Sequence, residues 1–201
     1  MKNSLIILAF FAVGVALGIS EKLPDLMMKT DFSMFALYGL MFLVGIGIGA
    51  DRKSWLVMRK MNLKIFLVPL GVIVGTLAGT AIISLLLPEL KLKEILAVGA
   101  GFGYYSLSSL LITEISGGEL GVIALLSNIM REVFTLLATP LLVQYFGKLA
   151  GIGSAGATSM DTTLPVITRF SGKEWSIISV FSGIVLTLLV PVLVTFILKF
   201  F

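Results

Sequence analysis

The sequence predicts an all-α integral membrane protein with about seven membrane-crossing segments, and its composition and its apolar runs predict that class. Of its 201 residues, 58% are hydrophobic and only 13% are charged. A soluble fold needs more polar sequence than this to cover its surface, whereas a bilayer surrounds the fold with apolar lipid. Apolar runs close to the length that spans a bilayer, about 20 residues, also recur along the chain.

Six of these runs are predicted to be membrane-spanning helices. They cover residues 5–19, 32–50, 63–87, 95–116, 120–146 and 176–200. The first follows a short basic start and resembles a signal peptide, but no small-x-small cleavage site follows it, so we expect a retained helix. The third run ends at Pro88, and the last contains Pro191.

Residues 151–170 are predicted to form a seventh helix, which is interrupted. Gly151, Gly153 and Gly156 disfavour a continuous helix, and Pro165 disfavours the helical conformation of the residue before it. The segment could cross the membrane, or it could dip in and return on the same side. We predict a crossing, because the basic residues that follow then lie in the cytoplasm.

Basic residues set the predicted orientation. The loop between the second and third runs is rich in arginine and lysine, so we expect it to be cytoplasmic. Its basic residues are Arg52, Lys53, Arg59, Lys60 and Lys64. The amino terminus then lies in the cytoplasm and the carboxyl terminus outside, with Arg169 and Lys173 on the cytoplasmic side. The net charge of +4 is therefore interpreted as a topology signal and not as a nucleic-acid-binding surface.

Missing residue types exclude several kinds of chemistry. The chain contains no Cys and no His, so it has neither a disulfide framework nor the commonest metal ligand and general base. It also has no phosphate-binding glycine loop with a lysine. We therefore expect no enzyme activity, no cofactor and no metal site. The remaining enzyme alternative is an aspartyl intramembrane protease, which needs two acidic residues on facing helices.

Three acidic residues remain as candidates once those beside charged or turn-forming neighbours are set aside: Glu114, Glu132 and Asp161. Glu132 is 13 positions after Glu119, which is about 20 Å along a helix, so it is expected deep in the membrane. Glu114 is followed closely by two glycines and is expected at the membrane interface more than at the midplane.

Polar residues share one face of the predicted helix around Glu132. Asn128, Glu132, Thr135 and Thr139 are spaced by four, three and four positions, which places them on one side of an α-helix. Such a stripe must face protein or water because lipid cannot satisfy it. Arg131 lies about 100° away around the helix and could pair with a carboxylate on a neighbouring helix. The alternative is a buried Arg–Glu pair that only holds two helices together.

Asp161 lies among hydroxyl side chains in the interrupted segment. Thr158, Ser159, Thr162 and Thr163 surround it in the sequence. Irregular backbone at membrane depth is tolerated only where it lines a cavity or is buried in protein, and interrupted helices hold substrates and ions in secondary transporters. The alternative is an external loop in which Ser159 or Asp161 caps a helix.

A third polar stretch is Gly-Phe-Gly-Tyr-Tyr-Ser-Leu-Ser-Ser at residues 101–109. Tyr104 and Ser106 could line a pore or contact a cation. Equally, Gly101 and Gly103 could only bend a packed helix.

Three motifs resemble the LysO-type lysine exporter family. They are the stretch at 101–109, Asn-Ile-Met-Arg-Glu at 128–132, and Gly-Ala-Thr-Ser-Met-Asp-Thr-Thr-Leu-Pro-Val-Ile at 156–167, and Leu-Leu-Val-Pro-Val-Leu at 188–193 fits as well. The resemblance implies efflux of L-lysine across the cytoplasmic membrane of a prokaryote. It also implies that acidic residues in the membrane, Glu132 and Asp161, are essential.

The resemblance is specific over residues 95–201, whereas residues 1–94 match only in being hydrophobic; we treat 1–201 as one transporter domain. Family members are often longer, so the chain resembles the larger piece of a split form. A small companion of about three spans would bring the total to about ten, which suits two inverted repeats with one broken helix each, as in antiporter-like transporters. A homo-oligomer is the other expected assembly.

The motifs lead to a hypothesis of exchange, in which Asp161 and Glu132 form an anionic site for L-lysine, a cation at neutral pH. A carboxylate removed from water binds protons more readily, so lysine and protons would compete for the same charge. Freed helix ends would hold the substrate carboxylate. The neutral hydrogen-bonding partners would be Asn128, Thr135, Thr158 and Thr162, and the wider candidate site includes Arg131, Tyr104, Ser106 and Glu114.

Two alternatives stay open at this point. The same carboxylates could exchange sodium or another small cation for protons. The chain could also be a membrane subunit that transports nothing, in which Arg131 and Glu132 hold a partner.

Overall fold

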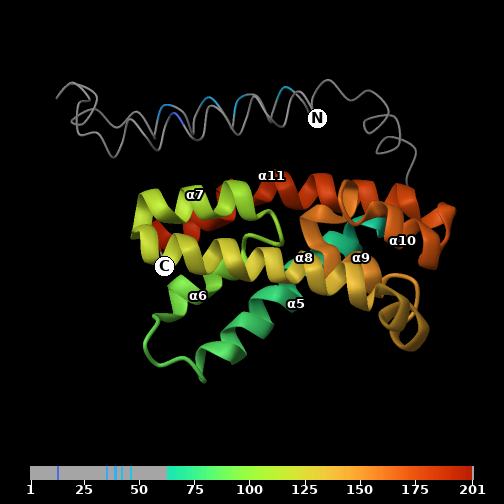
Figure 1. Cartoon of the computed structure of the whole chain (residues 1–201), viewed down its shortest axis with the longest axis horizontal. Coiled ribbons are helices and arrows are strands. Elements are labelled where there is room, and N and C mark those ends of the chain that lie inside the picture. Colours follow the sequence, from blue (N-terminus) through green and yellow to red (C-terminus); the bar gives the residue numbers. More distant parts are fainter. Residues whose placement is uncertain are drawn as a thin grey trace. The chain divides into compact units, whose positions relative to one another are not determined.

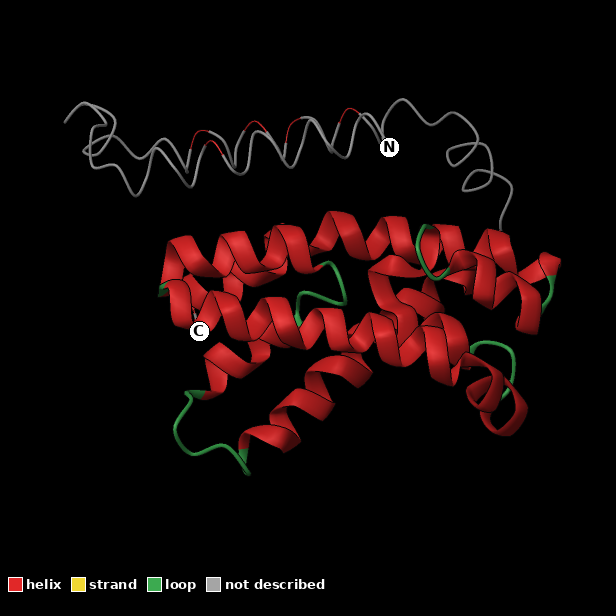
Figure 2. Cartoon of the chain, in the orientation of Figure 1, coloured by secondary structure: helices red, strands yellow, loops and turns green. Residues whose placement is uncertain are grey.

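The computed structural model describes residues 63–200, together with Val13, Phe35, Gly39, Phe42 and Ile46. Within 63–200 every regular element is a helix and none is a strand (Figure 2), which confirms the predicted all-α class. The spans predicted at 5–19 and 32–50, and most of the basic loop after them, lie outside the described residues.

The described elements alternate between long helices and short ones. They are η1 (Leu63–Phe66), α5 (Leu67–Ser84), α6 (Leu92–Gly99), α7 (Tyr105–Ser116), α8 (Gly118–Phe146), α9 (Ala150–Ala155), η2 (Gly156–Met160), α10 (Leu164–Ser171), η3 (Lys173–Trp175) and α11 (Ser176–Phe200). Three stretches are long and apolar enough to cross a membrane: Leu67–Ser84, Gly118–Phe146 and Lys173–Phe200. They correspond to the predicted spans at 63–87, 120–146 and 176–200.

Contacts at one end of the bundle fix the directions of α5 and α11. The ring of Phe66, just before α5, packs edge-to-face on Phe181 near the start of α11, with their centroids 5.0 Å apart. Val68 of α5 packs against a buried cluster that consists of Ile152, Ala155 and Ile167, and Trp175 and Ile178 pack there too. Helices α5 and α11 therefore begin at the same end, and this end also contains α9 and α10 (Figure 1).

Residues 92–116 form a hairpin in place of the predicted continuous span at 95–116, and we call it the first hairpin. Helix α6 ends at Gly99, and α7 begins at Tyr105. The chain reverses between them, where Phe102 and Gly103 have φ values of 46° and 92°. Figure 1 shows α6 and α7 at one end of the bundle, with the loop that joins them reaching toward the middle of α8.

Both ends of the first hairpin lie beside the start of α8. Leu90, just before α6, lines a pocket together with Glu119 and Ile123 of α8. At the other end, Gly121 of α8 lies against Thr113 of α7. The first hairpin therefore enters and leaves the bundle on one side.

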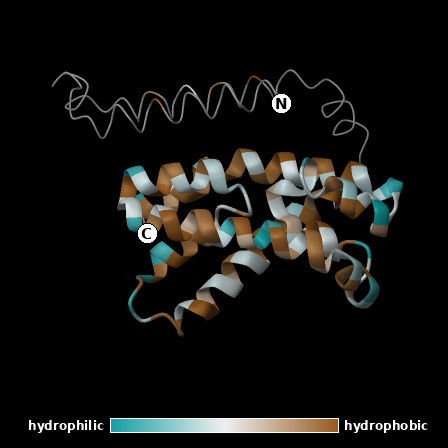
Figure 3. Cartoon of the chain, viewed as in Figure 1, coloured by the Kyte–Doolittle hydropathy of each residue, from teal (hydrophilic) through white to brown (hydrophobic). Residues whose placement is uncertain are grey.

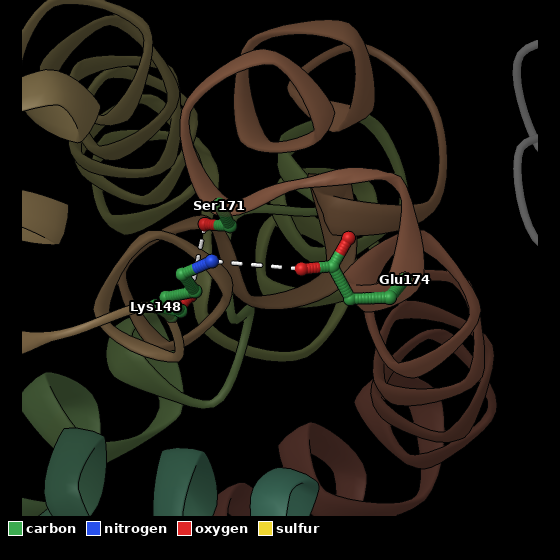
Figure 4. Close-up of polar contacts among 3 residues, drawn as sticks. All are labelled: Lys148, Ser171 and Glu174. Carbon is green, nitrogen blue, oxygen red and sulfur yellow. Dashed lines mark hydrogen bonds and ion pairs between the residues drawn. The ribbon is translucent and has the colours of Figure 1, made fainter.

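Residues 150–171, comprising α9, η2 and α10, form the second hairpin. Ser171 Oγ, at its end, donates a hydrogen bond to the Lys148 carbonyl oxygen just before its start, at 2.9 Å. Lys148 Nζ also lies 3.5 Å from Glu174 Oε1 in an exposed ion pair (Figure 4). The predicted crossing at 151–170 is therefore wrong, and the alternative of a segment that dips in and returns describes the structure. The chain can reverse because Gly156 adopts φ +65°, which side chains disfavour.

The two hairpins enter from opposite ends and meet at their tips. The first hairpin enters beside the start of α8, and the second enters beside its end, after Phe146. The Ala157 amide of the second tip donates to the Phe102 carbonyl oxygen of the first at 2.8 Å. The described part of the chain therefore contains three candidate spans and two hairpins, and the predicted count of seven crossings is not reached within it.

The hairpin geometry predicts where introduced cysteines are labelled. The chain has no Cys of its own, so Lys148→Cys, Glu174→Cys and Glu119→Cys each create a single thiol. In intact cells, a membrane-impermeant maleimide should label both positions 148 and 174 or neither of them. It should label position 119 only if it leaves positions 148 and 174 unlabelled. Labelling of only one of positions 148 and 174 from a given side would show that the segment crosses.

Candidate functional site

The middle of α8 holds the tip of the first hairpin through Asn128. Figure 3 shows hydrophilic residues midway along this mostly hydrophobic helix. The buried Asn128 side chain accepts a hydrogen bond from the Gly103 amide at 2.7 Å and donates to the carbonyl oxygens of Val98 at 3.2 Å and Ala124 at 2.9 Å. Two of these bonds, to the Gly103 amide and the Val98 carbonyl group, pair backbone groups beside the break between α6 and α7.

Arg131, one turn further along α8, holds the tip of the second hairpin. Its Nε donates to the Ser154 carbonyl oxygen at 2.9 Å, and its Nη2 donates to the Gly153 carbonyl oxygen at 3.1 Å. Its Nη1 donates to Thr76 Oγ1 of α5 at 3.2 Å. The predicted pairing of Arg131 with a carboxylate is absent from the described residues, where backbone carbonyl groups take that place.

Two further polar residues of the α8 stripe, Thr135 and Thr139, also face the second hairpin. Thr135 Oγ1 and Ser154 Oγ lie 2.7 Å apart and share a hydrogen bond. Thr139 is buried, and its methyl group lies against Gly151 of α9. Thr135 and Thr139 therefore contact protein, as their spacing predicted, whereas no sequence pattern indicated Ser154 or Thr76 as partners.

Hydroxyl groups tie the second hairpin to itself and to α11. Thr158 Oγ1 donates to the Ala155 carbonyl oxygen at 3.0 Å, and Thr163 Oγ1 donates to the Thr158 carbonyl oxygen at 2.9 Å. Ser159 and Ser179 exchange a reciprocal pair of hydroxyl-to-carbonyl hydrogen bonds, at 2.9 and 2.7 Å. Ser159 therefore fixes the tip against α11, a role that its position in the sequence did not indicate.

Asp161 and its neighbours differ from these residues because they are accessible. Asp161 and Thr162 are exposed, Ser106 is exposed, and Tyr104 is half-buried. Asp161 Oδ1 accepts a hydrogen bond from the Thr162 amide at 2.6 Å. Tyr104 directly follows the tip of the first hairpin and Asp161 directly follows η2 of the second, and the Ala157–Phe102 hydrogen bond joins these tips. The structure thus brings residues of both hairpin tips, Asp161 and Tyr104, to one accessible place.

The two remaining acidic candidates lie elsewhere. Glu132 is half-buried on α8, and no hydrogen bond or ion pair to its carboxylate occurs among the described residues. Glu114 is exposed near the end of α7, at the end of the bundle where the first hairpin enters. It therefore lies far along α7 from the hairpin tips, and its position at the membrane interface stays a prediction.

Most of the predicted neutral substrate ligands are therefore used by the fold. Asn128, Thr135 and Thr158 form their hydrogen bonds with backbone groups or with Ser154. Burial of such groups costs free energy unless they are paired. These side chains are therefore paired with the hairpin tips and are not available to a substrate. The accessible set that remains comprises Asp161, Thr162, Tyr104 and Ser106.

Loss of the Asn128 side chain should destabilise the fold. Asn128→Leu leaves the buried Gly103 amide without its acceptor and removes one of the two donors to the Val98 carbonyl oxygen, and we expect a loss of about 2 kcal/mol of unfolding free energy. Thermal unfolding of the detergent-solubilised protein measures the loss. Ser127→Ala, an exposed neighbour on α8, is the matched control and should change little; equal melting temperatures for both variants would contradict the assigned role.

The sequence signature of a family described as "Lysine exporter LysO" matches residues 8–198. The chain belongs to this family. The match confirms the resemblance predicted from the motifs, and it extends through the first half of the chain, which the motifs left uncharacterised.

Two family relatives illustrate the similarity. The chain is 34% identical to the lysine exporter LysO of Escherichia coli K12 over 196 residues, which cover 96% of this chain and 64% of the relative. It is 32% identical to a Haemophilus influenzae protein named "Putative lysine exporter" over 196 residues, which cover 96% of this chain and 97% of that relative. The chain thus spans a little under two thirds of the E. coli exporter. No solved structure matches it.

Proposed function

We propose that this chain is a secondary transporter that exports L-lysine across the cytoplasmic membrane of a prokaryote in exchange for protons. The observation that carries the proposal is the meeting of two hairpin tips beside the middle of α8, through Ala157 and Phe102, with Asp161 and Tyr104 accessible at the junction. Broken helices that meet within a membrane bundle form substrate sites in secondary transporters. Family membership supports lysine as the substrate.

Asp161 is the proposed binding group for an ammonium group of lysine. Its Oδ1 is held by the Thr162 amide, which orients the carboxylate, while Oδ2 makes no hydrogen bond within the described residues. A carboxylate binds either a cation or a proton. Lysine and a proton therefore exclude one another at Asp161, and Glu132 is proposed as a second carboxylate of the same kind. Tyr104 and Ser106 supply hydrogen bonds from the first hairpin.

The opposite entry of the hairpins supplies a route to alternating access. Movement of the first hairpin away from α8 would open the junction toward the end of the bundle from which that hairpin enters. Movement of the second hairpin would open it toward the other end. Because each hairpin connects to the bundle at its own end only, the two openings need not occur together.

The charges at the two ends indicate the orientation. The end where the second hairpin enters has four basic residues and one acidic residue in the described range, namely Lys64, Lys148, Arg169, Lys173 and Glu174. The opposite end has an excess of acidic residues, namely Glu89, Glu94, Glu114 and Glu119 against Lys91, Lys93 and Lys199. The positive-inside rule places the first of these ends in the cytoplasm. The second hairpin is therefore proposed to enter from the cytoplasm and the first from outside.

The proposed assembly includes a partner. The E. coli relative is longer than the matched region, whereas the H. influenzae relative is matched over 97% of its length. A small companion membrane protein, or a second copy of this chain, is proposed as a partner. The alternative of a subunit that transports nothing assumed that Arg131 holds a partner protein. Arg131 binds the second hairpin of its own chain instead, so it does not support this alternative.

Uptake of radiolabelled L-lysine into everted membrane vesicles with an imposed proton gradient tests the proposal. Vesicles with this chain should accumulate lysine, and accumulation should collapse when a protonophore dissipates the gradient. Vesicles from cells with an empty vector provide the background. If the inserted chain gives no uptake, either alone or with its companion, the proposed function is wrong.

A further inference from the structure

The guanidinium of Arg131 completes the broken end of α9. The last carbonyl groups of a helix have no donor within the helix. If α9 continued, the Ala157 amide would donate to the Gly153 carbonyl oxygen, but it donates to Phe102 instead. Arg131 Nη2 donates to Gly153 in its place, and Nε donates to the Ser154 carbonyl oxygen. A permanent positive charge therefore lies against the oxygen atoms that the break leaves open.

The same kind of oxygen atom binds coupling cations in other transporters. Unwound carbonyl groups and the carboxyl ends of half-helices coordinate sodium where membrane helices are broken. Two carbonyl groups that already accept hydrogen bonds from a guanidinium cannot also ligate a sodium ion at the same positions. Arginine is suited to this place because it stays charged and presents several donors in a fixed plane.

We propose that Arg131 replaces a coupling cation at the break of the second hairpin, so that lysine transport by this chain does not require sodium. The inference rests on the proposed function and specifies its coupling ion.

A groove lies beside this place among the described residues. It has a volume of about 540 Å³ and is lined by Gly71, Gly75, Thr76 and Gly153, among others. Thr76 and Gly153 are two of the residues whose oxygen atoms Arg131 contacts. Removal of the Arg131 side chain would therefore leave a site that guanidinium or sodium can reach.

Exchange of radiolabelled for unlabelled lysine across proteoliposomes, with the companion protein where it is needed, tests the inference in sodium and in choline buffers. Wild-type exchange should be equal in both. Arg131→Ala should lose exchange by about 100-fold in choline, because two hydrogen bonds from a charged donor are lost. Addition of about 20 mM guanidinium, or of sodium, should raise the exchange rate of Arg131→Ala about tenfold. Arg131→Lys, which keeps the charge but loses the paired geometry, should be intermediate and independent of sodium.

Arg169→Ala is the matched control. Arg169 is exposed, with its guanidinium 5.6 Å from the centre of the Phe170 ring, and its removal should leave exchange unchanged in both buffers. Three results would overturn the inference: wild-type exchange that requires sodium, full exchange by Arg131→Ala in choline, or a folded Arg131→Ala that neither ion restores.

Two further outcomes also decide the matter. If Arg131→Ala does not fold, the exchange rates of the wild type and of Arg131→Lys test the inference. Sodium dependence of either rate overturns the inference, and sodium independence of both supports it. If the wild type exchanges no lysine in any buffer, the proposed function fails by itself. Melting temperatures then decide the role of Arg131: about 20 mM guanidinium should raise that of Arg131→Ala but not that of the wild type, and equal responses would overturn the inference.

Discussion

Asp161→Asn should abolish proton-driven lysine transport, with a loss of at least about 100-fold in initial rate, while membrane insertion and folding stay intact. The amide keeps the shape of the carboxylate and can still accept the hydrogen bond from the Thr162 amide. It can neither carry the charge that attracts an ammonium group nor bind a proton near neutral pH. Because Asp161 is exposed and its hydrogen bonds are local, the fold depends little on its charge.

The everted-vesicle assay measures this loss, and immunoblotting of the membranes verifies equal insertion. Glu174→Gln is the matched control, because Glu174 is an exposed carboxylate at the far end of the same hairpin in a surface ion pair with Lys148. Surface pairs of this kind contribute little to stability, so transport should persist. Glu132→Gln should also lose transport if both carboxylates act as proposed. Normal transport by Asp161→Asn would show that the charge of Asp161 is not needed at the substrate site.

Gly156→Val should separate the hairpin tips, with a loss of at least about 3 kcal/mol of unfolding free energy and of all transport. A Cβ atom at position 156 would overlap the Phe102 carbonyl oxygen and would come within 3.1 Å of Arg131 Nη2. The Phe102 carbonyl oxygen accepts the hydrogen bond that joins the tips, and Arg131 Nη2 holds the second hairpin against α8. The φ value of +65° adds strain that a β-branched side chain cannot relieve.

Gly153→Ala is the comparison that isolates this effect. Gly153 is three positions earlier in the same hairpin, and a Cβ atom added there meets no other described atom within 4 Å. Its carbonyl group remains available to Arg131. Thermal unfolding and lysine uptake should therefore be near normal for Gly153→Ala, and similar behaviour of the two variants would show that the tips do not need the close approach at Gly156.

Sequence patterns predicted the long helices well and the hairpins poorly, for a physical reason. Apolar length reports how much chain can lie in a membrane, and it located α5, α8 and α11 to within a few residues. It does not report direction. Residues 95–116 contain enough apolar sequence for a span, but Gly103 and the Asn128 contact turn the chain back. Reversal depends on a partner 25 positions away, which local pattern cannot show.

The candidate site was predicted in part for a related reason. The spacing of Asn128, Thr135 and Thr139 correctly placed them on a face that contacts protein. Their partners are backbone atoms of the two broken segments, which have no side-chain signature in the sequence. Arg131 shows the same limit, since an arginine beside a glutamate suggests an ion pair, whereas two freed carbonyl groups of α9 bind it here.

The position of Asn128 and Arg131 on one helix also bears on how the protein is made. The first hairpin is synthesised before α8, and the buried amide of Gly103 at its tip donates its hydrogen bond to Asn128 of α8. Unpaired backbone groups are costly in lipid, so this hairpin cannot adopt its folded position until α8 has entered the membrane. The second hairpin emerges afterwards and meets an Arg131 already in place. Translation and assembly therefore proceed in an order that makes α8 the template on which both re-entrant segments fold, and a nascent chain truncated before α8 would be a substrate for membrane quality control.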